Sequence, residues 1–187
     1  AARGAGRRRQ PDGADGLVEA RIVTAYDIAR GEPPSQVGQV EADPVRNPPI
    51  RAGDVLVPAV ARRLAARVAA GEDVGAYPAA SVHVVRTDPE ILDPWFLAGL
   101  LSSTEGNRQA ERLGSSLGGQ MRVELRRVRV PLPSIEVQRA YGAVFRQIAE
   151  FSARLQQARD VGLDLARATT DALGLRLRPP VAEDGDR

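Results

Sequence analysis

The side chains that most often carry catalysis or hold metals are nearly absent from this sequence. The chain has 187 residues, with no Cys and a single His, His83. This excludes a cysteine nucleophile, a thiolate metal site and a disulfide framework, and disfavours zinc sites and hydrolytic triads, which need several such residues. His83 stands between apolar residues in segment 81–86, so we expect a hydrogen-bonded structural histidine. The sequence predicts no catalytic residue, no metal and no cofactor.

Two short motifs have the residue types of nucleotide chemistry but lack essential parts. Asn47-Pro48-Pro49 matches the start of the tetrapeptide with which amino-methyltransferases hold a target amine, but Ile50 offers no ring to stack on a base. Residues 114–120 form a Gly/Ser loop whose backbone N–H groups could cradle a phosphate. Because this loop lacks the Lys of an ATP-binding loop, contact with a DNA backbone and a plain linker both stay open.

Arginine is the abundant side chain that binds phosphate. All 26 basic residues are Arg, against 24 acidic residues, for a formal net charge of +2. Exclusive use of Arg in an Ala- and Pro-rich chain is typical of a GC-rich genome, so neither feature alone indicates a nucleic-acid partner. The basic excess lies between residues 61 and 130. It contains one cluster of Arg62, Arg63 and Arg67 and a second that begins at Arg122.

Apolar spacing and the positions of Gly and Pro indicate the elements that hold these residues. Strands are expected over 17–28 (leading into a short helical turn), 55–57, 64–70 and 81–86. Asp93 followed by Pro94 is typical of a helix start, and a second helix is expected over 104–113. No apolar run approaches the ~18 residues that a membrane span needs.

A heptad repeat predicts one long helix near the C-terminus. It begins at Ser134, and apolar or small residues follow at alternating spacings of four and three as far as Ala172. The stripe is too long for a domain of this size to cover, so we expect it to pair with another long helix; a helix on the surface of its own domain is the alternative. Small residues replace large ones after Leu155. The expected pairing residues are Val137, Tyr141, Val144, Ile148, Phe151 and Leu155.

Taken in order along residues 17–173, these motifs resemble a target recognition domain of the specificity (S) subunits of type I restriction-modification systems. The resemblance rests on Gly53-Asp54 before an apolar strand and on Asp93-Pro94-Trp95-Phe96-Leu97 with Leu101-Ser102-Ser103 at the end of that helix. It also rests on Pro131-Leu132-Pro133 followed by Gln138. Family members usually continue after the first motif with a Gly-containing loop, whereas residues 58–67 are Arg-rich and have no Gly.

The resemblance implies an α+β chain in which a globular recognition domain of mixed sheet and helices precedes a long helix of coiled-coil type. The expected order is a flexible linker (1–16), a DNA target recognition domain (17–133), a dimerisation or spacer helix (134–173) and a disordered tail (174–187). The candidate DNA-binding residues are Arg62, Arg63, Arg67, Ser115, Ser116, Gln120 and Arg122.

The implied function is to read double-stranded DNA in the cytoplasm without catalysis. An adenine-N6 methyltransferase, as a separate subunit or a fused domain, would do the chemistry, and the long helix would form a homodimer or pair with another helix. The Ala1 start and the basic N-terminal segment fit a second hypothesis, in which the chain is the C-terminal part of the methyltransferase polypeptide. A third is a coiled-coil interaction protein without DNA reading.

Overall fold

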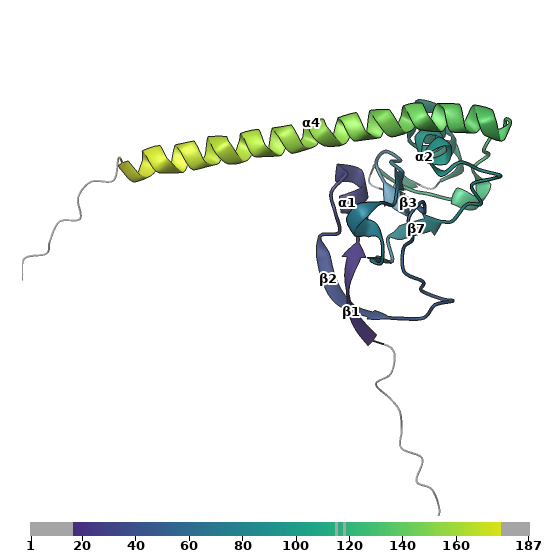
Figure 1. Ribbon diagram of the computed structural model, residues 1–187, viewed down its shortest axis with the longest axis horizontal. Coiled ribbons are helices and arrows are strands. Elements are labelled where there is room, and N and C mark those ends of the chain that lie inside the picture. Colours follow the sequence, from purple (N-terminus) through teal and green to yellow (C-terminus); the bar gives the residue numbers. More distant parts are fainter. Residues whose placement is uncertain (1–16, 115, 118, 177–187) are drawn as a thin grey trace, which may run out of the picture. The chain divides into compact units, whose positions relative to one another are not determined.

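The structure, a computed structural model, describes residues 17–176 except 115 and 118. The expected linker 1–16, Ser115 and residues 177–187 of the expected tail lie outside the described residues. The chain divides into two compact units, Ala1–Phe145 and Arg146–Arg187. The fold class is confirmed as α+β, because three small sheets and several helices are followed by a long C-terminal helix (Figure 1).

The first sheet surrounds the strand expected at the start of the domain. Its strand order is β2-β1-β6, with bounds Gln36–Glu41, Leu17–Val23 and Tyr77–Pro78. Helix α1 (Ala25–Arg30) follows at once because Thr24 and Asp27 form a capping box: the Thr24 hydroxyl accepts from Asp27 N at 3.2 Å and Asp27 Oδ2 accepts from Thr24 N at 2.8 Å. Gly31 ends the helix at φ 64°.

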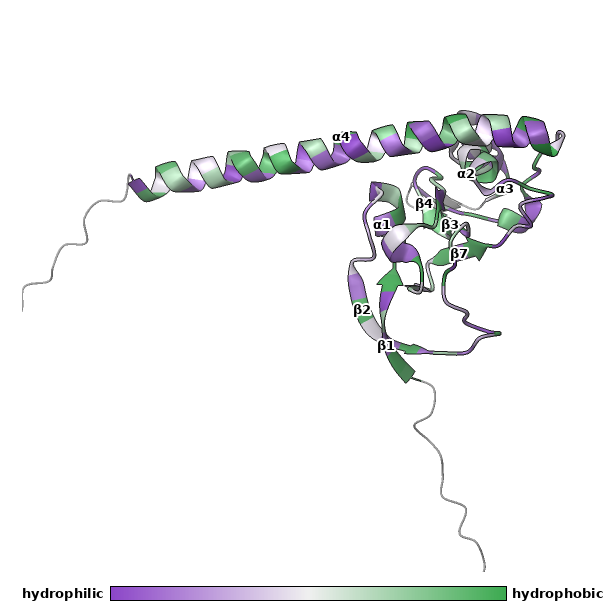
Figure 2. Cartoon of the chain, viewed as in Figure 1, coloured by the Kyte–Doolittle hydropathy of each residue, from purple (hydrophilic) through white to green (hydrophobic). Residues whose placement is uncertain are grey.

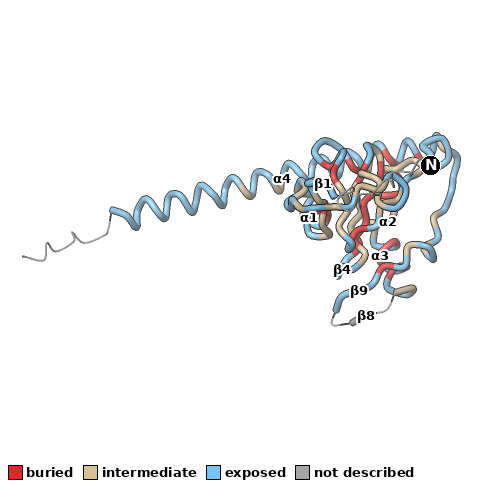
Figure 3. Tube along the Cα trace, turned by 90° about the horizontal axis from the view of Figure 1, so that it is seen from below, coloured by how far each residue is buried: buried red, intermediate tan, exposed pale blue. Residues whose placement is uncertain are grey.

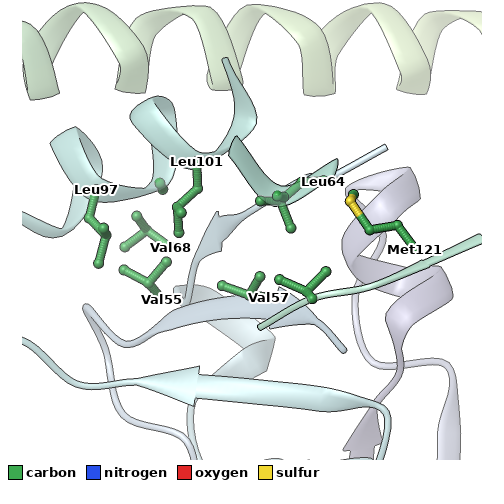
Figure 4. Packing of buried hydrophobic residues seen from close by; sticks show 10 residues of the cluster. Val55, Val57, Leu64, Val68, Leu97, Leu101 and Met121 are labelled. Atoms are coloured by element: carbon green, nitrogen blue, oxygen red, sulfur yellow. The ribbon is translucent and has the colours of Figure 1, made fainter. Parts of the chain in front are cut away.

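The second sheet carries the core of the domain. Its order is β5-β3-β7, with bounds Arg67–Val68, Val55–Pro58 and Val82–Val85. Strand β3 is buried on both faces, so its side chains alternate between two apolar clusters. Val55 and Val57 lie in a cluster with Leu97 and Leu101 of a covering helix (Figure 4), while Leu56 belongs to a second cluster.

The Gly53-Asp54 motif is the turn that starts β3. Gly53 has φ 85°, a left-handed conformation that side chains with a Cβ rarely adopt. The Asp54 carboxylate is 2% exposed and accepts two hydrogen bonds from the Arg86 guanidinium, at 2.7 and 2.6 Å, and one from Arg51 N at 2.8 Å. The bond to Asp54 raises the pKa of Arg86. This motif therefore has a structural role here.

We expect Gly53→Ala to lower the free energy of unfolding by about 1–2 kcal/mol, since the cost of the left-handed conformation falls on any residue with a Cβ. A new Cβ meets nothing within 4 Å, so sterics do not contribute. Urea denaturation measures the change. Gly53→Asn is the control, because Asn tolerates this conformation better. Equal losses for the two variants would contradict the backbone explanation.

The third sheet is small and antiparallel. Its order is β4-β9-β8, with bounds Val60–Ala61, Gln120–Arg122 and Ser116–Leu117. Two short 3-10 helices, Gly71–Asp73 and Leu125–Arg127, lie elsewhere in the unit. This sheet brings residues 60–61 beside residues 121–122.

Two consecutive helices begin where the sequence predicts. Asp93 Oδ1 accepts from Phe96 N at 2.8 Å and starts α2 (Pro94–Ser102). Ser103 Oγ accepts from Gly106 N at 3.0 Å and starts α3 (Thr104–Leu113), which has the bounds expected from the sequence.

The long helix α4 (Ile135–Arg176) is fastened by its first turns to the start of α2. Gln138, 1% exposed, accepts from Asp93 N at 3.1 Å and donates to the carbonyl oxygens of Ile91 at 3.1 Å and Pro133 at 2.9 Å. Farther along, a Cβ added to Gly142 would lie 2.2 Å from Asp93 Oδ1, and one added to Gly99 of α2 would lie 2.1 Å from the Phe145 ring. These contacts explain why the first unit extends to Phe145, whereas the sequence places a boundary after residue 133.

Some elements differ from the expected ones. Strand β2 lies in a segment where the sequence predicts no strand. The strand expected over 64–70 is reduced to Arg67–Val68, and the Gly/Ser loop 114–120 contains β8 and the first residue of β9. Strand β2 is stabilised by an antiparallel ladder of six residue pairs with β1, and the short strands β5, β8 and β9 depend likewise on pairing with other strands, so local pattern does not decide them.

Candidate nucleic-acid interface

The third sheet places two of the predicted DNA-binding side chains on one outer face. Successive residues of a strand point to opposite sides, and in β9 the middle residue, Met121, is buried. Gln120 and Arg122 on either side of it are exposed. Arg122 is directly opposite Val60 of β4, so it lies beside the strand that leads to residues 62 and 63.

Arg62 and Arg63 follow β4 and directly precede Leu64, whose main chain is bonded to a buried side chain of α3. Asn107 Oδ1 accepts from Leu64 N at 2.7 Å, and Asn107 Nδ2 donates to Leu64 O at 3.2 Å and to Ser103 O at 2.9 Å. Leu64 itself fills the core and is 1% exposed. The backbone after the two arginines is therefore fixed, while both arginines are exposed.

Three of these guanidinium groups are without a salt bridge to any residue in the described part of the chain. Among the residues that the structure describes, Arg62, Arg63 and Arg122 form no ion pair. Arg86, by comparison, is bound to the buried Asp54. Exposed guanidinium groups without partners retain their donors for an external anion.

Arg67 is committed to the interior, unlike the other predicted arginines. Its side chain is 18% exposed, and it bonds to Asp73 Oδ1 at 2.7 Å and to the carbonyl oxygens of Asp27 and Glu32. Burial raises the pKa of Asp73, while the charge of Arg67 acts in the opposite direction. The guanidinium thus ties α1 to β5, and we remove Arg67 from the candidate DNA-binding set.

The other predicted DNA-binding positions lie in or near the third sheet or outside the described residues. Ser116 lies in β8 opposite Met121 of β9. Ser115 is outside the described residues. Arg126, Arg127 and Arg129 of the second basic cluster are exposed around the 3-10 helix that follows β9. The pairing of β4 with β9 therefore brings the segment that holds Arg62 and Arg63 beside Gln120 and Arg122. We call these four residues the arginine surface.

An open hollow of about 430 Å³ adjoins the arginine surface. Its lining consists of Arg62, Arg63, Thr104, Asn107, Arg108 and Glu111. Asn107 and the other α3 residues are not among the positions that the sequence predicts. One signal was present: Asn is unfavourable inside a helix, so an Asn in the middle of a predicted helix indicates a side chain with a specific hydrogen-bonding role.

The predicted pairing residues of α4 form an exposed apolar stripe. The six side chains from Val137 to Leu155 are 41–63% exposed. Figure 2 shows apolar positions recurring along α4, and Figure 3 shows the tube of residues 146–176 exposed along almost its whole length. Large apolar side chains of this kind are normally covered, so the stripe indicates a contact surface.

His83 is not the hydrogen-bonded structural histidine that the sequence predicts. It lies in β7, but its side chain is exposed and forms no hydrogen bond with any residue in the described part of the chain. No group of three or more His, Asp or Glu side chains in that part could hold a metal ion. None of its helices has the length and apolar content to cross a membrane.

Comparisons with known structures identify the fold. The chain is similar to the HsdS subunit from Thermoanaerobacter tengcongensis, with a TM-score of 0.50 and 19% identity over 91% of this chain and 46% of that one. It also matches a chain from a structure concerned with complex assembly and conformational transition of the type I R-M system, with a TM-score of 0.45 and 18% identity over 92% and 46% of the two chains. Neither a family model nor a curated protein matches the sequence. The chain spans less than half the length of each structural neighbour and has the fold of that part of an HsdS subunit.

Proposed function

We propose that this chain is a sequence-specific DNA-binding module of a restriction-modification system. The observation that carries the proposal is the arginine surface, where three exposed guanidinium groups without ion pairs gather beside Gln120. Arg forms bidentate bonds to phosphate and to the O6 and N7 atoms of guanine, and Gln does so to adenine. The likeness in fold to an HsdS subunit supports the same function.

In this proposal the chain binds DNA and another polypeptide catalyses the reaction. The chain directs an adenine-N6 methyltransferase, a partner subunit in the cytoplasm, to the DNA sequence that it binds. The alternative, in which the chain is the C-terminal part of that methyltransferase, uses the arginine surface in the same way. The third hypothesis, a coiled-coil protein without DNA reading, leaves the arginine surface unexplained.

The stripe on α4 supports pairing with a second copy of this chain, and the sizes of its residues favour an antiparallel pair. Large side chains occupy the heptad positions up to Leu155, and Ala158 and Gly162 occupy the next two. In an antiparallel pair of heptad helices, Phe151 faces Gly162 of the second copy and Leu155 faces Ala158. Phe151 and Leu155 then each fill the space beside a small residue, whereas a parallel pair leaves two glycines facing each other.

The charges flanking the stripe favour the same arrangement. In a parallel pair, Arg154 of one copy lies beside Arg159 of the other, since residues five apart flank the contact between parallel helices. Asp160 accepts from Arg159 at 2.8 Å, so it neutralises the charge of Arg159 but not that of Arg154. In the antiparallel pair Arg154 lies beside Val161 and Arg159 beside Ser152, so like charges are separated.

We expect Arg62→Ala, Arg63→Ala and Arg122→Ala each to weaken binding to duplex DNA. If each guanidinium contacts a phosphate, each substitution reduces the slope of log K against log salt by about 1. Fluorescence anisotropy with a labelled random-sequence duplex, titrated at several salt concentrations, measures both quantities.

Arg46→Ala is the matched control, because the Arg46 side chain is 86% exposed and lies outside the arginine surface. Its affinity and salt slope should equal those of the unaltered chain. Absence of salt-dependent binding by the unaltered chain, or an equal loss in Arg46→Ala, would refute the proposed function.

A further inference from the structure

One face of α3 presents a row of side chains toward the hollow beside the arginine surface. Thr104, Arg108 and Glu111 are spaced by four and three residues, so they lie on one side of the helix, and all three are exposed. The opposite side of α3, with Gly106 and Ala110, is buried. An α-helix fits the major groove of DNA, where side chains on its exposed face reach the base edges.

Glu111 is an acidic residue in an otherwise basic hollow. It shares the lining with Arg62, Arg63 and Arg108, yet among the described residues it forms no ion pair. Arg108 has one weak contact, 3.7 Å to the exposed Glu105. A carboxylate at this place repels DNA phosphates, so it opposes general DNA binding unless a base supplies a hydrogen-bond donor.

We propose that Arg108 and Glu111 read one G·C base pair in the major groove, an inference that rests on the proposed function. The Glu111 carboxylate accepts from the N4 amino group of cytosine, and the Arg108 guanidinium donates to O6 and N7 of the paired guanine. These are the pairings that the major-groove pattern of donors and acceptors specifies for Glu and Arg. Side chains three apart on a helix are neighbours, as are the edges of two paired bases.

Arg62 and Arg63 complete the site from the other side of the hollow. Asn107 holds the segment after β4 against α3, so the position of these two arginines relative to the exposed face of α3 is fixed. They contact phosphates on either side of the G·C pair, which offsets the repulsion caused by Glu111. The phosphate contacts thus position the chain on the DNA, and the α3 residues distinguish one base pair from another.

The experiment compares sequence selection by the full chain and its variants. The chain is used to select bound duplexes from a randomised pool, and affinities are then measured for the selected duplex and for versions with each G·C pair replaced by A·T. We expect one replacement to weaken the unaltered chain about ten-fold or more. Glu111→Leu, which removes the acceptor as well as the charge, and Arg108→Gln should each abolish most of the discrimination at that same base pair.

Glu111→Leu should also bind unselected DNA as tightly as the unaltered chain or more tightly, because it removes a negative charge. Glu41→Leu, which alters an exposed carboxylate of β2 outside the hollow, is the matched control and should select the same sequence with the same strength. An unchanged ratio of selected to unselected affinity in Glu111→Leu overturns the inference, as does an equal loss on all sequences in Arg108→Gln. Either result leaves the proposed function standing, whereas failure of the unaltered chain to bind DNA overturns both.

Discussion

Replacing both Ile148 and Phe151 with Asp should convert a self-associated chain into a monomer at every concentration tested. The two side chains are 55% and 63% exposed in the single chain, and burying each in a helix pair contributes about 1.5–3 kcal/mol. Two new carboxylates in the stripe remove that gain and add repulsion. We expect the dissociation constant to rise at least about 100-fold. Sedimentation equilibrium over a wide range of concentrations measures it.

Ala149→Asp with Ala153→Asp is the matched control, because it adds the same charges to the same turns of α4 outside the stripe. This control should associate like the unaltered chain. A sedimentation profile that is unchanged by Ile148→Asp and Phe151→Asp would refute pairing through the stripe.

Single cysteines test the direction of pairing, since the chain has no Cys of its own. A mixture of Phe151→Cys and Gly162→Cys chains should form a mixed disulfide dimer under mild oxidation, because these positions face each other in the antiparallel pair. Gly162→Cys alone should remain uncrosslinked. Efficient crosslinking of Gly162→Cys to itself would indicate a parallel pair.

Gln138→Ala should cause one of the largest losses of stability available from a single polar residue in this chain. The substitution leaves Asp93 N and the carbonyl oxygens of Ile91 and Pro133 without the bonds that Gln138 supplies, and opens a space at a buried position. We expect the free energy of unfolding to fall by about 2–4 kcal/mol. Urea denaturation followed by circular dichroism measures this change.

Gln147→Ala is the matched control on the same helix, since Gln147 is exposed. It should change the free energy of unfolding by less than about 0.5 kcal/mol. Equal effects of the two substitutions would contradict the assigned role of Gln138.

Local signals in the sequence predict most of the helices and the buried strands. The Asp93-Pro94 start and the heptad repeat each depend on residues close in sequence, and α2, α3 and α4 begin within one residue of the expected positions. Strand β3 is predicted because an apolar run directly follows a Gly-Asp turn. These elements give the α+β class without knowledge of tertiary contacts.

The candidate site is predicted only in part, because it depends on pairing between distant residues. Arg62 and Arg122 are 60 residues apart and become neighbours through the ladder between β4 and β9, which has two residue pairs. Arg67 has the same residue type and nearly the same position as Arg63, yet its side chain turns inward to Asp73. No local pattern distinguishes an arginine that binds an internal acid from one that faces solvent.

Because Asn107 holds the segment after β4 through its main chain, the side chains that would set the DNA preference of this chain can be replaced without loss of the fold. Asn107 bonds to the segment after β4 through main-chain atoms of Leu64, so the fold does not require Arg at positions 62 and 63. The exposed residues of α3 are equally independent of the core. A combinatorial library at positions 62, 63, 108 and 111 should therefore yield folded variants with altered DNA preferences, and natural divergence can follow the same route without compensating changes in the core.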